Sequence, residues 1–221
     1  MSLESQRHAR LEDEGAALLD SASAFWTRYG KVALGVLAAL VVAGAATYFT
    51  MTSRRSAEEQ AAGRLAEATL HYFQGDLQRA RETARQVAEQ FPDTPSGNDG
   101  HRLMGDAAFW SNDYKGAIAE YRRYLAKAPK GVLTDAANRS LAYALENDGQ
   151  PAEAAKLFEG LVGKFDRESS GEFLAAAARC QRAAGDAGGA KRNLERLIAE
   201  FGETSYARSA RITVAELSVT P

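Results

Sequence analysis

One long apolar run lies near the N-terminus of the chain and predicts a helix that crosses a membrane. No charged residue lies between Lys31 and Arg54, and the segment 32–51 is almost entirely apolar or small. At about 1.5 Å per residue, about 20 helical residues span about 30 Å, the thickness of a bilayer's hydrocarbon core. We therefore expect a polar N-terminal tail with an aromatic and basic end (1–31), a transmembrane helix (32–53) and a second domain (54–221).

A cleaved secretory signal is the competing interpretation of this run, with the small residues 43–45 as its cleavage site. Signal peptides begin with a short basic segment. Here 31 residues precede the run, and they include Glu12, Asp13, Glu14 and Asp20. Rings such as Trp26 before the run also suit a membrane boundary. We therefore expect the helix to remain in the mature protein.

Small residues recur at every fourth position of the run, at Gly35, Ala39 and Ala43. On a helix they form one ridge, which allows a second transmembrane helix to approach closely. Gly and Ala are also common in membrane helices without any packing role, and both explanations stay open. The orientation is open too, because basic residues flank both ends of the run.

After Arg54 the hydrophobic pattern repeats four times. The turn residues Gly75, Asn112, Gly149 and Gly185 lie 37, 37 and 36 residues apart. Gly and Asn tolerate the left-handed backbone that ends many helices. A period of this size predicts stacked units, each with two antiparallel helices. The segment 204–217 predicts one more helix, which covers the apolar side of the last unit.

Small residues stand at fixed distances from each turn. Seven residues before it are Ala68, Gly105, Ala142 and Ala178, and five residues after it are Ala80, Ala117, Ala154 and Ala190. A third row, nine residues after the turn, consists of Ala84, Tyr121, Phe158 and Leu194. We expect the first two rows to let paired helices approach closely and the third to pack between units. The predicted fold class is all-α.

The composition narrows the possible functions. The chain has 27 basic and 29 acidic residues and a net charge of −2, which gives no basic surplus for binding nucleic acid. Its one cysteine, Cys180, excludes an intramolecular disulfide framework, and its place in the repeat predicts a buried apolar residue. The three histidines, His8, His71 and His101, have no companion at metal-ligand spacing. We predict no metal, no cofactor and no catalytic site.

The segments Gly75-Asp76-Leu77-Gln78-Arg79-Ala80 and Asn112-Asp113-Tyr114-Lys115-Gly116-Ala117, followed twelve residues after each alanine by Pro92 and Pro129, resemble the tetratricopeptide repeat. The segments 91–95 and 201–207 resemble its longer-period variant from bacterial envelope assembly proteins. The period exceeds the usual ~34 residues, and the third and fourth repeats lack the closing proline. The resemblance implies a tetratricopeptide-type α-solenoid of about four helix pairs plus a C-terminal capping helix.

The resemblance also implies a binding surface, because the first helix of each tetratricopeptide pair lines an inner, concave face that holds peptides or partner helices. Transferred by register, this partner-binding face contains Tyr72, Phe73, Arg102, Asp106, Phe109, Trp110, Arg139, Tyr143, Glu146, Asn147, Arg179 and Arg182. Tyr, Trp and Arg are enriched at binding hot spots. Phe73, Phe109 and Trp110 fit equally well as packing against the preceding repeat, whereas arginines are less easily buried.

The segment 24–36, with Arg54, Arg55 and the alanine-rich helix that follows, resembles bacterial inner-membrane proteins with one span and a periplasmic tetratricopeptide domain. These are ancillary subunits of the Sec translocon that contact periplasmic chaperones. The resemblance implies an adaptor in the bacterial inner membrane, with integral membrane proteins and lipid contacting the span and a soluble protein or peptide on the repeats. A structural or assembly subunit of a large respiratory or photosynthetic membrane complex is the alternative function.

Overall fold

The computed structural model describes the backbone of residues 3–219 and the side chains of residue 16 and residues 20–216. His8 and the acidic residues 12–14 of the N-terminal tail therefore lie outside the described side chains. The backbone described is entirely helical, with short turns. Its helices are α1 (Leu3–Phe73), α2 (Leu77–Gln90), α3 (Pro95–Trp110), α4 (Tyr114–Lys127), α5 (Val132–Asn147), α6 (Pro151–Leu161), α7 (Arg167–Ala183), α8 (Ala187–Glu200) and α9 (Ser205–Val219).

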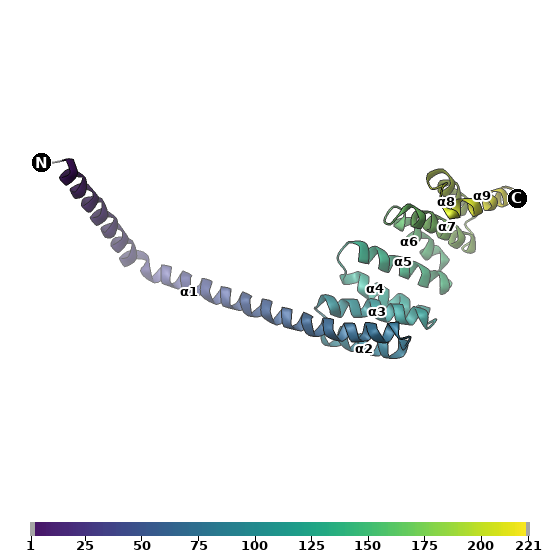
Figure 1. Cartoon of the computed structure of the whole chain (residues 1–221), viewed down its shortest axis with the longest axis horizontal. Coiled ribbons are helices and arrows are strands. Elements are labelled where there is room, and N and C mark those ends of the chain that lie inside the picture. The colour runs from purple at the N-terminus through teal and green to yellow at the C-terminus, as the bar shows by residue number, and fades with distance from the viewer. Residues whose placement is uncertain (1–2, 220–221) are drawn as a thin grey trace. The chain divides into compact units, whose positions relative to one another are not determined.

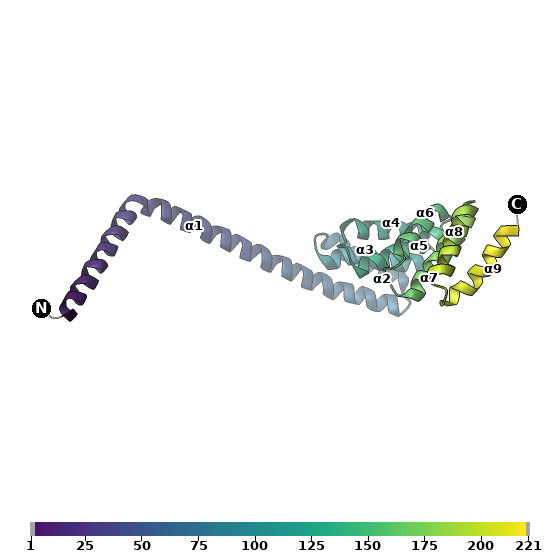
Figure 2. The same cartoon turned by 90° about the horizontal axis from the view of Figure 1, so that it is seen from above.

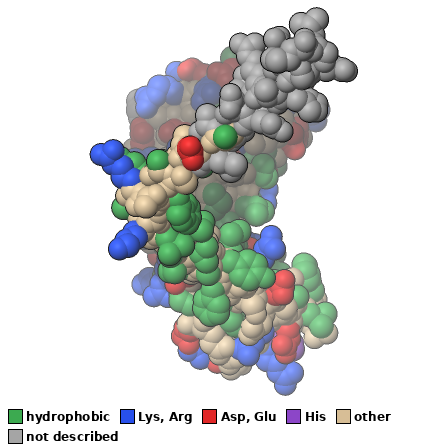
Figure 3. Space-filling model, turned by 90° about the vertical axis from the view of Figure 1, so that its left-hand side faces the viewer, with side chains coloured by type: hydrophobic (Ala, Val, Ile, Leu, Met, Phe, Trp, Pro, Cys, Tyr) green, Lys and Arg blue, Asp and Glu red, His purple; other side chains and the backbone are tan. Residues whose placement is uncertain are grey.

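The chain divides into two compact units, Met1–Arg55 and Ser56–Pro221. In the first unit, α1 exposes apolar side chains along the run found in the sequence, and Figure 3 shows them as a green stretch of helix. The part of α1 from Asp20 to Phe73 is long and apolar enough to cross a membrane, and none of its most apolar window is buried. The hydroxyls of Thr47, Thr50 and Thr52 donate to carbonyls of their own helix.

The second unit is a stack of helix pairs, which Figure 1 shows following one another from α2 to α9. The C-terminal part of α1 packs against α2 through Ala68, and the further pairs are α3 with α4, α5 with α6 and α7 with α8. Figure 2, seen from above, shows α3, α5 and α7 in one layer and α4, α6 and α8 in the other. The predicted all-α solenoid of four pairs and a capping helix is thus confirmed.

Each pair is joined by the same short turn, because the same backbone bonds end every first helix. In the first turn, the amide of Gly75 donates to the Tyr72 carbonyl and the amide of Asp76 donates to the His71 carbonyl, each over 3.0 Å. This arrangement requires a left-handed residue just past the helix. The predicted turn residues have that conformation, with φ values of 82° at Gly75, 59° at Asn112, 76° at Gly149 and 83° at Gly185.

An aspartate directly after the turn starts the second helix of three pairs. The side chains of Asp76, Asp113 and Asp186 accept bonds from the amides of the residues three positions later, at 3.1, 3.0 and 2.7 Å. Such caps satisfy amides that have no partner within the helix. In the third pair Pro151 occupies the start of the helix and lacks the amide that would need a cap.

The core between paired helices depends on the rows of small residues. Ala68, Ala142, Ala80, Ala117, Ala154 and Ala190 are all completely buried. Tyr121 and Phe158, from the row that packs between repeats, are 1% and 0% exposed. The paired helices α3 and α4 approach closely at Gly105, where an added Cβ would lie only 2.7 Å from the ring of Tyr121. The ring therefore occupies the space that a side chain at position 105 would need.

Neighbouring repeats are also joined by carboxylates that bind the start of the next first helix. Glu58 accepts bonds from the amide and hydroxyl of Ser96 at the start of α3, at 3.2 and 2.7 Å. Glu168 binds Ser205 at the start of α9 in the same way. Negative charge is favourable at a helix N-terminus. At the C-terminal end, α9 packs on α8 and α7 and buries Ala207 and Ala210.

Replacing Gly105 with alanine will destabilise the repeats, because the new methyl group must displace the buried ring of Tyr121. We expect a loss of about 1–3 kcal/mol in the free energy of unfolding. The measurement is denaturant unfolding of the full chain in detergent micelles, followed by circular dichroism. The control is Gly63→Ala in α1, where an added Cβ meets nothing within 4 Å. That change should gain roughly 0.5–1 kcal/mol by helix propensity, and equal effects of the two variants would contradict the packing argument.

Candidate functional site

The predicted binding residues lie on the first helices of the pairs, and five of them surround one pocket. This central pocket has a volume of about 300 Å³. It is lined by Asp106, Phe109, Trp110, Tyr121, Arg139, Ser140, Tyr143 and Glu172. These residues come from α3, α4, α5 and α7, and so from three successive repeats. The fold thus brings together the predicted residues Asp106, Phe109, Trp110, Arg139 and Tyr143.

Two tyrosine hydroxyls in the central pocket donate to carboxylates. Tyr121 donates to Asp106 over 2.8 Å, and Tyr143 donates to Glu172. Burial raises the pKa of both tyrosines, and the nearby carboxylates raise it further. Burial also raises the pKa of Asp106, an effect that the Tyr121 hydroxyl and then the Arg102 guanidinium oppose. Both hydroxyls therefore stay protonated and fix the direction of the carboxylates.

The aromatic residues divide between the core and the surface. Phe109 is half-buried and packs against the core, with its ring 5.9 Å from Trp110 and 5.6 Å from Tyr114. Trp110 and Phe73 are 65% and 79% exposed. Tyr72 contacts Phe73 edge to face at 5.6 Å and is half-buried. Phe109 thus packs against its own and the following repeats rather than the preceding one, and Phe73 and Trp110 are exposed.

Most of the predicted arginines are engaged within the protein. Arg102 pairs with Asp106 at 3.2 Å, and Arg179 makes two bonds to Glu146, at 2.6 and 2.9 Å. Arg139 lies with its guanidinium 5.5 Å from the centre of the Phe165 ring. Replacing Arg102 or Arg179 would therefore leave an uncompensated carboxylate as well as alter the surface.

The remaining predicted residues lie toward the C-terminal end of the same face. Arg179 and Arg182 line a second pocket of about 270 Å³ between α7 and α9, together with Tyr206. The amide of the exposed Asn147 donates to the Tyr143 carbonyl of its own helix, 2.8 Å away. These residues do not reach the central pocket.

Three residues of the central pocket were not predicted from the sequence. Tyr121 was expected only to pack between repeats, yet its hydroxyl reaches Asp106. Ser140 lies one residue after Arg139, and Glu172 lies near the start of α7, four residues after Glu168. An acidic residue also stands at the matching place of the second repeat, Asp99, but the third repeat has an alanine there. No periodic signal therefore marks Glu172.

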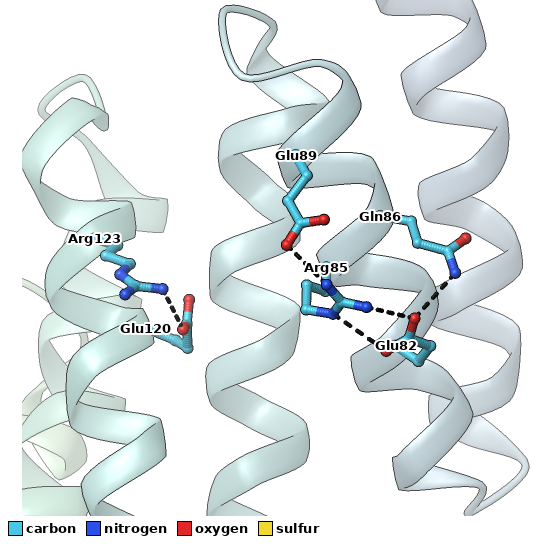
Figure 4. A network of polar contacts seen from close by, with 6 residues as sticks. All are labelled: Glu82, Arg85, Gln86, Glu89, Glu120 and Arg123. Carbon is cyan, nitrogen blue, oxygen red and sulfur yellow. Dashed lines mark hydrogen bonds and ion pairs between the residues drawn. The ribbon is translucent and has the colours of Figure 1, made fainter.

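The opposite, second-helix side of the stack also has a polar pocket, but its charges neutralise one another. This pocket of about 540 Å³ lies among α2, α3 and α4. Figure 4 shows Arg85 held between Glu82 and Glu89, at 2.7 and 2.9 Å, and Glu120 bonded to Arg123 at 2.8 Å. Because each of these charges has a partner, the pocket has little charge left to attract a ligand.

Reactive chemistry has no support among the described side chains. In that part of the chain, no group of three or more His, Cys, Asp or Glu is placed to hold a metal ion. Cys180 is buried, as expected, and burial, followed by the charge of Glu146, raises the pKa of its thiol to about 12. The thiolate is the nucleophilic form, so this cysteine is structural.

Comparisons with known proteins identify the repeats. Residues 23–183 match the family model described as tetratricopeptide repeat-like domain. This match includes the apolar run of α1 and extends to the end of α7. No curated protein sequence matches the chain.

Two solved structures are similar to this chain. One is of the putative kinesin light chain of Podosopora anserina with nearly identical TPR-like repeats, and the other is of a single-substitution variant of that protein. Each has a TM-score of 0.57 and 20% sequence identity. The alignments cover 72% of this chain and 85% or 86% of the other. At this identity the likeness concerns the fold alone.

Cys180 will resist alkylation in the folded protein. At pH 8, the fraction of Cys180 present as thiolate is roughly a thousandfold smaller than that of a free cysteine, whose pKa is about 8.5. Mass spectrometry after iodoacetamide treatment should show the folded chain unmodified and the denatured chain fully modified. As a control, Ala183→Cys places a thiol at an exposed position at the end of α7, which should react in the folded state. Rapid reaction of Cys180 itself would contradict its burial.

Proposed function

The chain belongs to the tetratricopeptide repeat-like domain family, and on this premise we propose that it is a membrane-anchored adaptor that holds a soluble protein or peptide at an integral membrane assembly. Solenoid repeats of this kind typically serve as interaction surfaces. The observation that carries the proposal is the central pocket beside the exposed ring of Trp110. An exposed tryptophan next to a concave, partly polar pocket has the character of a binding hot spot.

The proposed anchor is the apolar part of α1. Its large apolar side chains are exposed, for example Leu40 at 64% and Val42 at 69%. In water such a surface is unfavourable, whereas a bilayer would cover it. The threonine hydroxyls of the segment are bonded to its own backbone, as a lipid environment requires. The family match also includes this segment, which supports a lasting part of the protein rather than a removable leader.

We place the protein in the bacterial inner membrane, with the repeats in the periplasm and with translocon-associated partners. The support for this finer assignment is the resemblance of the segment 24–36 and of the whole layout to the translocon's ancillary subunits. Basic residues flank both ends of the apolar run, so charge does not decide the orientation. The span would contact lipid and integral membrane proteins, and its ridge of Gly35, Ala39 and Ala43 would be the closest contact.

Two arginines in the apolar run will release the chain from membranes. Each arginine at the centre of a span costs roughly 2.5–3.5 kcal/mol. We expect the wild-type chain to stay in the membrane pellet at alkaline pH and to dissolve in detergent, whereas Leu37→Arg with Val41→Arg moves it toward the soluble fraction. The control is Ala62→Arg, at an exposed position of α1 beyond the run. A soluble wild-type chain, or one shortened past residue 45 in its intact mass, would overturn the anchor.

The partner will be captured from the inner face of the repeats. We would place a photo-crosslinking amino acid at Trp110 or Phe73 and, as controls, at the exposed positions Ala119 of α4 and Lys156 of α6. Adducts of defined mass should form in cells from the first two positions and not from the controls. Trp110→Ala should lower recovery of the same partner at least tenfold, as hot-spot truncations of about 2 kcal/mol do. Equal adducts from both faces would count against an inner-face site.

A further inference from the structure

We propose that the central pocket receives one basic side chain, a lysine or arginine, of an extended peptide partner, with the carboxylate of Glu172 as its counter-charge and Trp110 as a wall. This rests on the proposed function and adds the chemistry of the partner. The pocket joins α3, α5 and α7, so an extended peptide lying across the first helices would pass over it. Its volume of about 300 Å³ is at the small end of ligand pockets, which suits a single side chain.

Of the two carboxylates that line the central pocket, Glu172 is the one with no positive partner among the described side chains. Asp106 has Arg102 at 3.2 Å, and Glu146 has Arg179 at 2.6 Å. Glu172 is half-buried and accepts a bond from the hydroxyl of Tyr143. Among the side chains that the structure describes, no lysine or arginine nitrogen lies within 4.0 Å of it. A half-buried carboxylate is partly desolvated, so an incoming cation gains more there than at an open surface.

The hydrogen bond from Tyr143 keeps this carboxylate in place. The Tyr143 ring packs edge to face on the buried Phe158, with centroids 4.9 Å apart. Its hydroxyl is a donor at neutral pH because burial and Glu172 raise its pKa. One carboxylate oxygen thus accepts this bond, and the other accepts no hydrogen bond from the described side chains. An arrangement fixed before binding lowers the entropic cost of binding.

The aromatic wall suits the same ligand. Trp110 and Phe109 line the pocket with their rings 5.9 Å apart. A cation over a tryptophan face is favoured by the ring's negative potential, and the aliphatic stem of a lysine or arginine packs well on such rings. Trp110 is mostly exposed, so its face is accessible to a partner.

Arg139 is the positive side chain of the pocket lining, and it favours a different ligand. An acidic peptide side chain would bind Arg139 instead of Glu172. The guanidinium of Arg139, however, already lies on the Phe165 ring, 5.5 Å from its centre. Arg139 makes no ion pair among the described side chains, but its guanidinium has an aromatic partner, whereas Glu172 has no cationic one, so we take Glu172 as the counter-charge for the ligand. The two charges give the proposal a direct test, because removing each has an opposite expected effect.

The test uses the full chain in lipid nanodiscs and a displayed library of random short peptides. Wild-type protein should select peptides enriched in lysine or arginine at one position. Glu172→Gln should lose this enrichment, whereas Arg139→Gln, which removes a positive charge that repels a basic side chain, should strengthen it. The matched control is Glu195→Gln, which removes the same charge from the exposed outer helix α8 and should select as the wild type does. Circular dichroism and thermal unfolding would confirm that each variant is folded.

A selected peptide then allows a double-mutant cycle between its basic residue and Glu172. Binding is measured from the fluorescence of Trp110 in a Trp26→Phe background, which leaves Trp110 as the remaining one of two tryptophans. Changing the peptide's basic residue to norleucine should weaken binding to the wild type about tenfold and leave binding to Glu172→Gln unchanged. Selection of acidic or uncharged residues, or equal binding of the norleucine peptide, would contradict the proposal of a basic ligand. The proposal that the inner face binds a partner would remain. Failure of the wild type to select any peptide would overturn both proposals.

Discussion

The close approach of two helices within each repeat is the constraint on which the second unit depends. A ring as large as that of Tyr121 fits between the helices only because position 105 has no side chain. A Cβ added at Gly105 would lie 2.7 Å from that ring. Burial of such a side chain contributes about 1.5–3 kcal/mol. In the other pairs, buried alanines at the same position allow the helices to approach closely. Because every pair repeats this contact, the first helices stay in one layer and present a single face.

Local rules predict the repeats well because the determinants are local. A glycine or asparagine past the end of a helix acts on its own turn, and all four predicted turn residues have positive φ. The periodic small residues could be recognised for the same reason, since each repeat displays them at the same distance from its turn. Cys180 was expected to be buried from its place in the repeat, and it is.

The candidate site was less predictable, because its polar contacts join residues that are far apart in the sequence. The pairing of Arg102 with Asp106 follows the four-residue spacing of a helix face and could have been anticipated. The pairing of Arg179 with Glu146 joins residues 33 positions apart, on α7 and α5. Glu172 lies 29 residues after Tyr143 in the sequence, and only the stacked repeats place the two side by side. The sequence therefore placed the predicted residues on the first helices, where the structure has them, but treated the arginines as free charges.

The central pocket takes its walls from three successive repeats, and this has a thermodynamic consequence. In a solenoid, each repeat contacts its neighbours alone, so the array can open from either end, one unit after another. Any molecule seated against α3, α5 and α7 at once must be released before one of these repeats can open separately. Occupancy would then convert a chain of independently fraying modules into one cooperative block.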